Sequence, residues 1–120
     1  MAKGPTHEKS FAFALRVVKL AKYLQDEKKE FVLSRQILRS GTAIGALVRE
    51  AEHADSKADF AHKMNIALKE ANETLYWLEL LYQGEYITEQ SYESIRTDSE
   101  ELVKLLVSIV KTTKAAIRAK

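Results

Sequence analysis

The chain has no cysteine among its 120 residues. This absence excludes disulfide bonds, thiolate nucleophiles and zinc sites built on cysteine ligands. Proline occurs once and glycine four times, so few residues interrupt long regular elements. No apolar run approaches the roughly 20 residues of a membrane span, and the first six residues lack the apolar segment of a secretory signal. We therefore expect one soluble, cytoplasmic domain over residues 1–120, without a membrane partner and with a single core.

Charge is distributed unevenly along the chain, although the formal net charge is only +2. Residues 1–49 carry a net charge of +6, residues 50–101 carry −9, and residues 102–120 carry +5 with no acidic residue. This pattern predicts one basic and one acidic surface. Such surfaces are typical of polyanion binding or of charge-complementary self-assembly.

Apolar residues recur at helical spacing, and no run alternates with a period of two, which argues against β-strands. Polar and glycine-containing breaks divide the chain into four segments. The predicted helices cover about residues 6–25, 34–53, 56–83 and 88–118, and the second carries Ile37, Ile44, Val48 and Ala51 on one face. Short loops join antiparallel neighbours. The expected fold is an all-α, antiparallel up-down-up-down four-helix bundle.

Several residues mark the ends of these helices. Thr6 and Thr88 are the expected N-caps of the first and fourth helices. Ser56 and Asp59 have the spacing of a capping box at the start of the third helix. Gly84 is expected to end that helix.

Two predicted helices carry more apolar surface than one core can cover. In the first helix, one stripe includes Phe11 and Val18, and a second stripe lies on another side. In the third helix, four apolar residues lie off the core stripe: Ile66, Tyr76, Trp77 and Leu80. We assign the extra positions to contacts between subunits: Phe13, Val17, Leu20, Ile66, Trp77 and Leu80. The alternative is a wide core stripe with scattered apolar surface residues.

Gly41 and Gly45 lie four residues apart in the second predicted helix. Each costs roughly 1 kcal/mol relative to alanine in a helix interior. The spacing therefore indicates that another backbone packs closely on this face, either within the bundle or between subunits.

The histidines and carboxylates do not form a convincing metal or catalytic site. Glu50 with His53, and Asp59 with His62, imitate the Glu-x-x-His spacing of di-iron bundles, but both pairs flank one predicted turn instead of pointing into mid-bundle. No nucleophile accompanies a general base, and no glycine-rich loop follows a strand. We expect no enzymatic activity, no metal and no cofactor.

Basic residues on the first and last helices form two rows that could merge, because these helices are usually neighbours in such a bundle. Residues at the start of the second helix could extend the rows. The candidate nucleic-acid-binding residues are Lys9, Arg16, Lys19, Lys104, Lys111, Lys114 and Arg118, with Arg35 and Arg39. Such a stripe would contact phosphates in a salt-sensitive way. From charge alone, a solvated basic face fits equally well.

The segment SRQILRSGTAIGA at residues 34–46 resembles the small bacterial four helix bundle protein family, also called the 23S rRNA intervening-sequence protein family. The resemblance covers roughly residues 11–111. It continues at DF (59–60), IALKEA (66–71), ET (73–74), YWL (76–78) and GEYI (84–87). Leu47 stands where members usually carry Asn, so any polar contact made by that Asn is absent here.

The resemblance implies a four-helix bundle that assembles into rings, with pentamers in related proteins, and no established enzymatic activity. Members are encoded in insertions within ribosomal RNA genes. The accessory proteins of diversity-generating retroelements are similar in architecture and bind reverse transcriptase and nucleic acid through a basic surface.

Two functional hypotheses follow. The first is a non-catalytic homo-oligomer, with a pentameric ring expected, that binds RNA, DNA or a ribonucleoprotein such as a reverse transcriptase complex through the basic stripe. The alternative is a structural or partner-protein scaffold that does not bind nucleic acid. Salt-dependent binding distinguishes the two hypotheses.

Overall fold

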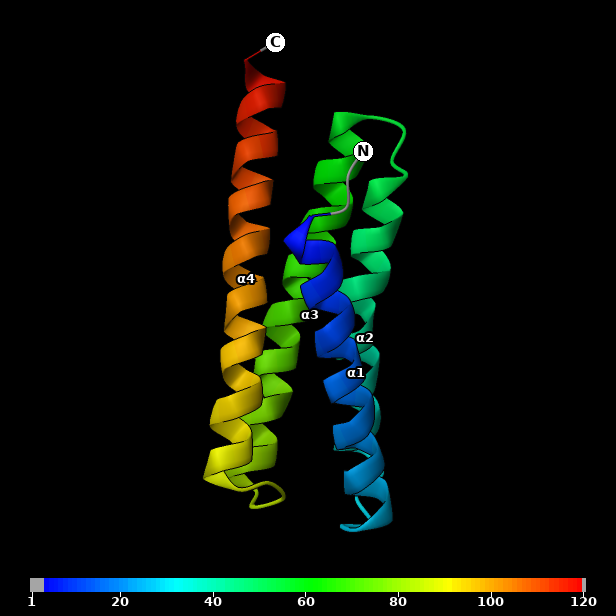
Figure 1. Ribbon diagram of the computed structural model, residues 1–120, viewed down its shortest axis with the longest axis vertical. Helices are drawn as coiled ribbons and strands as arrows, with labels where there is room; N and C mark the ends of the chain where they lie inside the picture. Colours follow the sequence, from blue (N-terminus) through cyan, green and yellow to red (C-terminus); the bar gives the residue numbers. More distant parts are fainter. Residues whose placement is uncertain (1–3, 120) are drawn as a thin grey trace.

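The computed structural model describes residues 4–119 and forms an antiparallel bundle of four α-helices (Figure 1). The helices are α1 (Pro5–Asp26), α2 (Leu33–Glu52), α3 (Lys57–Gln83) and α4 (Glu89–Arg118). Each helix packs against the next, α4 also contacts α1, and no β-strand occurs within residues 4–119. The predicted all-α, up-down-up-down bundle is confirmed. Every helix end lies within one residue of its expected position.

The start of α1 differs from the prediction. Gly4 is the N-cap residue and Pro5 occupies the first helical position, so Thr6 lies inside the first turn and is buried. Proline suits the first position because its fixed φ is already helical and its missing N–H would have no partner there. The prediction that Thr6 caps this helix was therefore wrong.

The start of α2 is capped by a buried carboxylate. Glu30 accepts hydrogen bonds from the backbone N–H groups of Val32, Leu33 and Ser34, at N–O distances of 3.2, 3.0 and 2.8 Å. Lys29 precedes it in the left-handed region, with φ of 54°, and turns the chain into the corner. A carboxylate at this end is favourable because it pairs unsatisfied donors and faces the positive end of the helix dipole.

The predicted ends of α3 and α4 are confirmed. Ser56 Oγ accepts the backbone N–H of Asp59 at 3.0 Å. Thr88 Oγ1 accepts the backbone N–H of Ser91 at 3.1 Å. Gly84 is the residue at which α3 ends.

The core runs along the bundle axis and is built from all four helices. From α2 it contains Ile37, Ile44, Val48 and Ala51, as the helical spacing predicted. The stripe of α1 that enters the core is Phe13, Val17, Ala21 and Leu24. Leu47 packs against this core with its side chain partly buried.

Both glycines of α2 face α1 inside the bundle. A β-carbon at Gly41 would lie 2.7 Å from Val17 Cγ2, and one at Gly45 would lie 3.4 Å from the backbone oxygen of Ser10. The close backbone approach indicated by this spacing is therefore packing of α1 on α2 within one chain. Contact between subunits is not needed to explain it.

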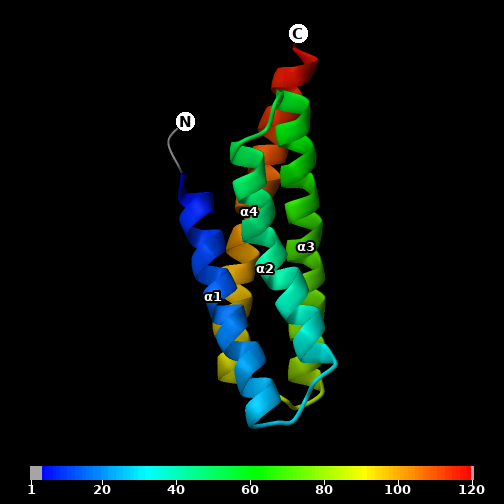
Figure 2. The same ribbon diagram turned by 90° about the vertical axis from the view of Figure 1, so that its right-hand side faces the viewer.

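The seam between α1 and α4 is the most loosely packed of the four helix contacts. The two helices diverge toward the end that carries the loop between α1 and α2 (Figure 1). At the opposite end, α4 continues past the start of α1 (Figures 1 and 2). The bundle is thus elongated, with extents of 52 × 22 × 20 Å.

Candidate nucleic-acid interface

Two of the predicted α1 cations bind carboxylates of α4. Lys9 Nζ lies 2.7 Å from Glu101 Oε2, and an Arg16 guanidinium nitrogen lies 2.7 Å from Asp98 Oδ2. Arg16 also donates to the backbone oxygen and the hydroxyl of Ser94, at 3.2 and 3.0 Å. These residues connect α1 to α4 across the loose seam. Their charges are largely compensated within the chain.

Arg39 is likewise paired, on the opposite side of the bundle. It contacts the carboxylates of Glu70 and Glu73 on α3, and Glu73 also accepts the indole N–H of Trp77 at 2.9 Å. Arg35 is exposed near the start of α2. That position is at the end of the bundle opposite to the C-terminal end of α4 (Figure 1).

The remaining predicted cations on α4 form a row that we call the cationic row: Lys104, Lys111, Lys114 and Arg118. All four are exposed, and no salt bridge joins any of them to another residue of the range 4–119. At about 100° per residue they fall within an arc of about 80°, and the row is about 21 Å long. This arrangement leaves a continuous cationic strip available to an external anion.

The C-terminal part of the cationic row lies away from the basic residues of α1. Asp98 and Glu101 occupy the side of α4 that faces α1. At about 100° per residue Lys111 lies about 140° around the helix from Asp98, whereas Lys104 lies only about 60° from Glu101. Lys19 is exposed on α1 and has no salt bridge in the described chain. Two carboxylates thus stand between the α1 cations and the row, and only Lys104 lies near the α1 side.

The first half of α4 is acidic and self-compensated. Arg96 pairs with Glu93 at 2.6 Å and Glu100 at 2.8 Å, and its guanidinium lies 5.6 Å from the ring centre of Tyr92. Tyr92 stacks on Tyr82 of α3 with ring centres 4.6 Å apart. Burial raises the pKa of the Tyr92 hydroxyl, and Arg96 opposes this effect. Free positive charge on α4 therefore begins only after Glu101.

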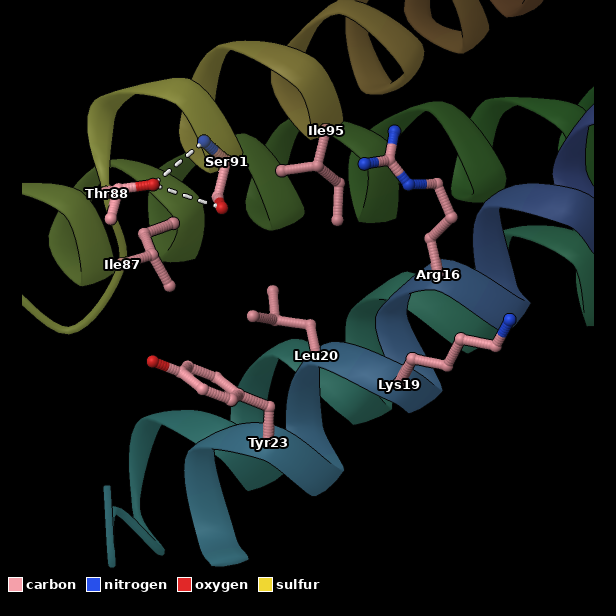
Figure 3. A pocket seen from close by; sticks show the side chains of 8 residues that line it. All are labelled: Arg16, Lys19, Leu20, Tyr23, Ile87, Thr88, Ser91 and Ile95. Atoms are coloured by element: carbon pink, nitrogen blue, oxygen red, sulfur yellow. Dashed lines mark hydrogen bonds between the residues drawn. The ribbon is translucent and has the colours of Figure 1, made fainter. Parts of the chain in front are cut away.

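A groove with a volume of about 540 Å³ lies between α1 and α4 where the helices diverge. Figure 3 shows Leu20, Ile87 and Ile95 facing one another across it, with Tyr23 at one end and Lys19 directed outward. Thr88 and Arg16 also line it, but both are already used, as a helix cap and in an ion pair. The groove presents apolar side chains and no acid–base pair.

Two of the predicted interface residues are in the core instead. Phe13 is 2% exposed and Val17 is fully buried, so their assignment to a subunit contact was wrong. The stripe left outside consists of Phe11, Leu15 and Val18, which are 50%, 48% and 46% exposed. We call these three residues the exposed α1 stripe. Helical periodicity identifies two apolar stripes but does not say which one faces inward.

The other predicted interface residues are partly buried. Leu20, Trp77 and Leu80 belong to this class, as does Ile66. Leu20 and Trp77 pack against the core. On α3, the strongly exposed aromatic residue is Tyr76, whose ring meets that of Trp77 edge-on at 5.1 Å. Which of these two adjacent rings is the exposed one could be recognised only from the orientation of α3.

One histidine makes a structural contact between helices. His7 Nδ1 lies 2.6 Å from Glu52 Oε2, which joins the start of α1 to the end of α2. Glu50 pairs with Lys63 at 3.4 Å, away from any metal-like arrangement with His53. Over residues 4–119 no group of three metal-ligating side chains occurs. None of the four helices is long and apolar enough to cross a membrane.

Comparison with known proteins identifies similar sequences and structures. The model of the family described as 23S rRNA-intervening sequence protein matches residues 5–108. A crystal structure from Bacteroides thetaiotaomicron VPI-5482, of a protein with unknown function from the S23 ribosomal protein family, is 64% identical. It superposes with a TM-score of 0.88, covering 88% of this chain and 98% of that one. No curated protein matches significantly.

Proposed function

Because the chain belongs to the 23S rRNA-intervening sequence protein family, we propose that it is a non-catalytic, homo-oligomeric protein that binds nucleic acid or a ribonucleoprotein. The binding surface is the cationic row of α4. The observation that carries this proposal is the contrast between this row and the other basic residues. Lys9, Arg16 and Arg39 have carboxylate partners in the chain, whereas the cationic row has none among the described residues.

Unpaired surface cations favour a polyanion for a physical reason. Each phosphate that they neutralise releases condensed counterions, so affinity falls steeply as salt rises. A cation that already has a carboxylate partner must give up that pair first, and it therefore contributes less. The acid-free stretch after Glu101 avoids this loss and avoids repulsion between carboxylates and phosphates.

Fluorescence anisotropy with labelled nucleic acid tests this proposal. We expect binding that weakens steeply between about 50 and 200 mM salt. The variant Lys104→Glu/Lys111→Glu should lose most of this affinity, whereas Lys22→Glu, a charge reversal on the exposed surface of α1, should retain it. Absence of binding at low salt would favour the scaffold alternative.

Self-association is the second part of the proposal, with a pentameric ring expected from the family resemblance. It is supported by the exposed α1 stripe, because burying the exposed half of each of these side chains would contribute roughly 1 kcal/mol. Phe11 is only partly covered, by the Arg49 guanidinium 5.1 Å from its ring centre. Contact between this stripe and the exposed Tyr76 region of another subunit would be heterologous, and contacts of this kind can close into rings.

Light scattering distinguishes the assembled protein from a monomer. We expect Leu15→Asp, on the exposed α1 stripe, to dissociate the oligomer and leave a helical monomer. Thr97→Asp, at an exposed position on α4, is the matched control and should leave the mass unchanged. A concentration-independent monomer mass for the unmodified protein would contradict this part of the proposal.

A further inference from the structure

The C-terminal part of α4 projects beyond α1, and its tip projects beyond the other helices. The pair between Lys9 and Glu101 fixes the level of α4 relative to α1. From that level α1 extends for only four more residues, to Pro5, or about 6 Å, whereas α4 extends to Arg118, or about 25 Å. Figures 1 and 2 show α4 running well past the start of α1, whereas only its tip passes the start of α3. The C-terminal turns of α4 are therefore uncovered on the side of α1, and the turn between α2 and α3 flanks another side as far as Ala116.

The outer side of this projection is cationic and narrow. Lys111, Lys114 and Arg118 alternate with the short exposed side chains of Ser108 and Ala115. After Glu101 the sequence has no acidic residue, and after Tyr92 it has no aromatic residue.

Nearby carboxylates lie on the other side of the projection. Glu52 and Asp55 line a groove of about 390 Å³ together with Thr113 and Ala116 of α4. This groove is formed by α4 and the turn between α2 and α3. At about 100° per residue, Thr113 lies about 160° around α4 from Lys111. An anion that approaches the cationic row therefore does not meet these carboxylates.

The shape and composition of the projection favour one class of nucleic acid. Proteins that bind single strands generally use aromatic side chains as stacking platforms, which this surface lacks. An α-helix with its side chains is about 10–12 Å across, and the major groove of B-form DNA is about 12 Å wide. The major groove of an A-form RNA helix is too deep and narrow to be read in this way.

We propose, building on the nucleic-acid-binding function above, that the outer face of the C-terminal half of α4 docks in the major groove of duplex DNA. Lys104, Lys111, Lys114 and Arg118 contact the phosphates along one side of the groove, and Ser108 and Ala115, at the edge of the cationic row, approach the floor without a bulky side chain. Few side chains on this surface can make paired hydrogen bonds to bases, so the contact has little sequence preference.

The test compares three labelled probes of one sequence: a DNA duplex of about 20 base pairs, or two helical turns, the matching RNA duplex and the single DNA strand. We expect the DNA duplex to bind at least about tenfold more tightly than the other two at the same salt concentration. The major-groove ligand methyl green should compete for it, and the minor-groove ligand netropsin should not.

Variants assign the contact to α4. Lys111→Glu/Lys114→Glu should lower DNA affinity about tenfold or more and reduce the salt slope by about two, while Lys22→Glu should change neither. Circular dichroism and light scattering of each variant ensure that folding and assembly are unchanged.

The outcomes separate this inference from the proposed function. Equal or tighter binding of the RNA duplex or the single strand would overturn the DNA assignment and leave nucleic-acid binding intact. Competition by netropsin instead of methyl green would overturn groove entry. Unchanged affinity of Lys111→Glu/Lys114→Glu would overturn the role of α4. Failure of all three probes to bind at low salt would overturn the proposed function itself.

Discussion

Val17 of α1 packs directly on Gly41 of α2, so closely that a β-carbon at position 41 would come within 2.7 Å of Val17 Cγ2 and 2.8 Å of Cγ1. Valine is stiff at χ1 and fully buried here, so it cannot rotate away at low cost. The absence of a side chain at Gly41 is therefore what allows α1 to lie against α2.

We expect Gly41→Ala to destabilise the protein by up to about 2 kcal/mol. Overpacking costs roughly 1–3 kcal/mol, and the higher helix propensity of alanine offsets only about 1 kcal/mol. Urea unfolding at fixed protein concentration, followed by circular dichroism, measures the change.

Gly45→Ala is the matched control, because its β-carbon would meet the backbone oxygen of Ser10 at an ordinary 3.4 Å. It should be neutral or slightly stabilising. Equal destabilisation by both substitutions would contradict the assigned role of Val17.

The carboxylate of Glu30 provides a second test of the fold. Glu30→Gln should lower stability by about 1–2 kcal/mol, because a charge-assisted cap is replaced by a weaker neutral one that faces the same helix dipole. Glu27→Gln, an exposed change in the same loop, should have little effect. If the two variants unfold at the same urea concentration, Glu30 is not the cap that holds the start of α2.

The two apolar stripes of α1 can be distinguished by truncation. Phe13→Ala should cost about 3–5 kcal/mol because it empties a fully enclosed core position. Leu15→Ala, on the exposed α1 stripe, should change the stability of the isolated subunit by less than about 1 kcal/mol. The same unfolding experiment measures both. A larger loss of stability in Leu15→Ala than in Phe13→Ala would mean that the stripe of Leu15, and not that of Phe13, faces the core.

Burial of Tyr92 predicts a spectroscopic signature at high pH. Burial raises its folded pKa above the ordinary value of 10, so it keeps its proton to a higher pH than an exposed tyrosine does. The stabilisation from this neutral form is complete below the unfolded pKa and is lost as pH rises through the folded pKa. Ultraviolet titration should show a late-ionising tyrosine that Tyr92→Phe removes. Persistence of the late-ionising tyrosine in Tyr92→Phe would contradict it.

Local signals predicted the helices well, because a hydroxyl cap such as Thr88 or a terminal glycine such as Gly84 acts within one turn. Apolar spacing likewise located the buried face of α2. The orientation of α1 could not be predicted in this way, because α1 has two apolar stripes. Which stripe faces the core depends on the packing of Val17 against Gly41 of α2. A clue was available in Ser10, whose small side chain continues the buried stripe opposite Gly45.

The sequence could predict which cationic residues belong to the candidate site, but it could not predict which cations form ion pairs within the chain. Lys111 and Lys114 stand out in an acid-free segment, so their availability follows from the sequence itself. Arg16 and Asp98 are 82 positions apart, and their contact depends on how α1 lies against α4. Ion pairs of this kind decide which cations are left for a partner, and only the folded arrangement reveals them.

The most direct measurement compares paired with unpaired cations in one salt series. Lys9→Gln/Arg16→Gln removes the α1 cations bound to α4, and Lys111→Gln/Lys114→Gln removes half of the cationic row. For nucleic acid bound by the folded protein, the α4 variant should lower the slope of log affinity against log salt by about two, and the α1 variant should leave it unchanged. A larger loss of slope in the α1 variant than in the α4 variant would contradict binding through α4.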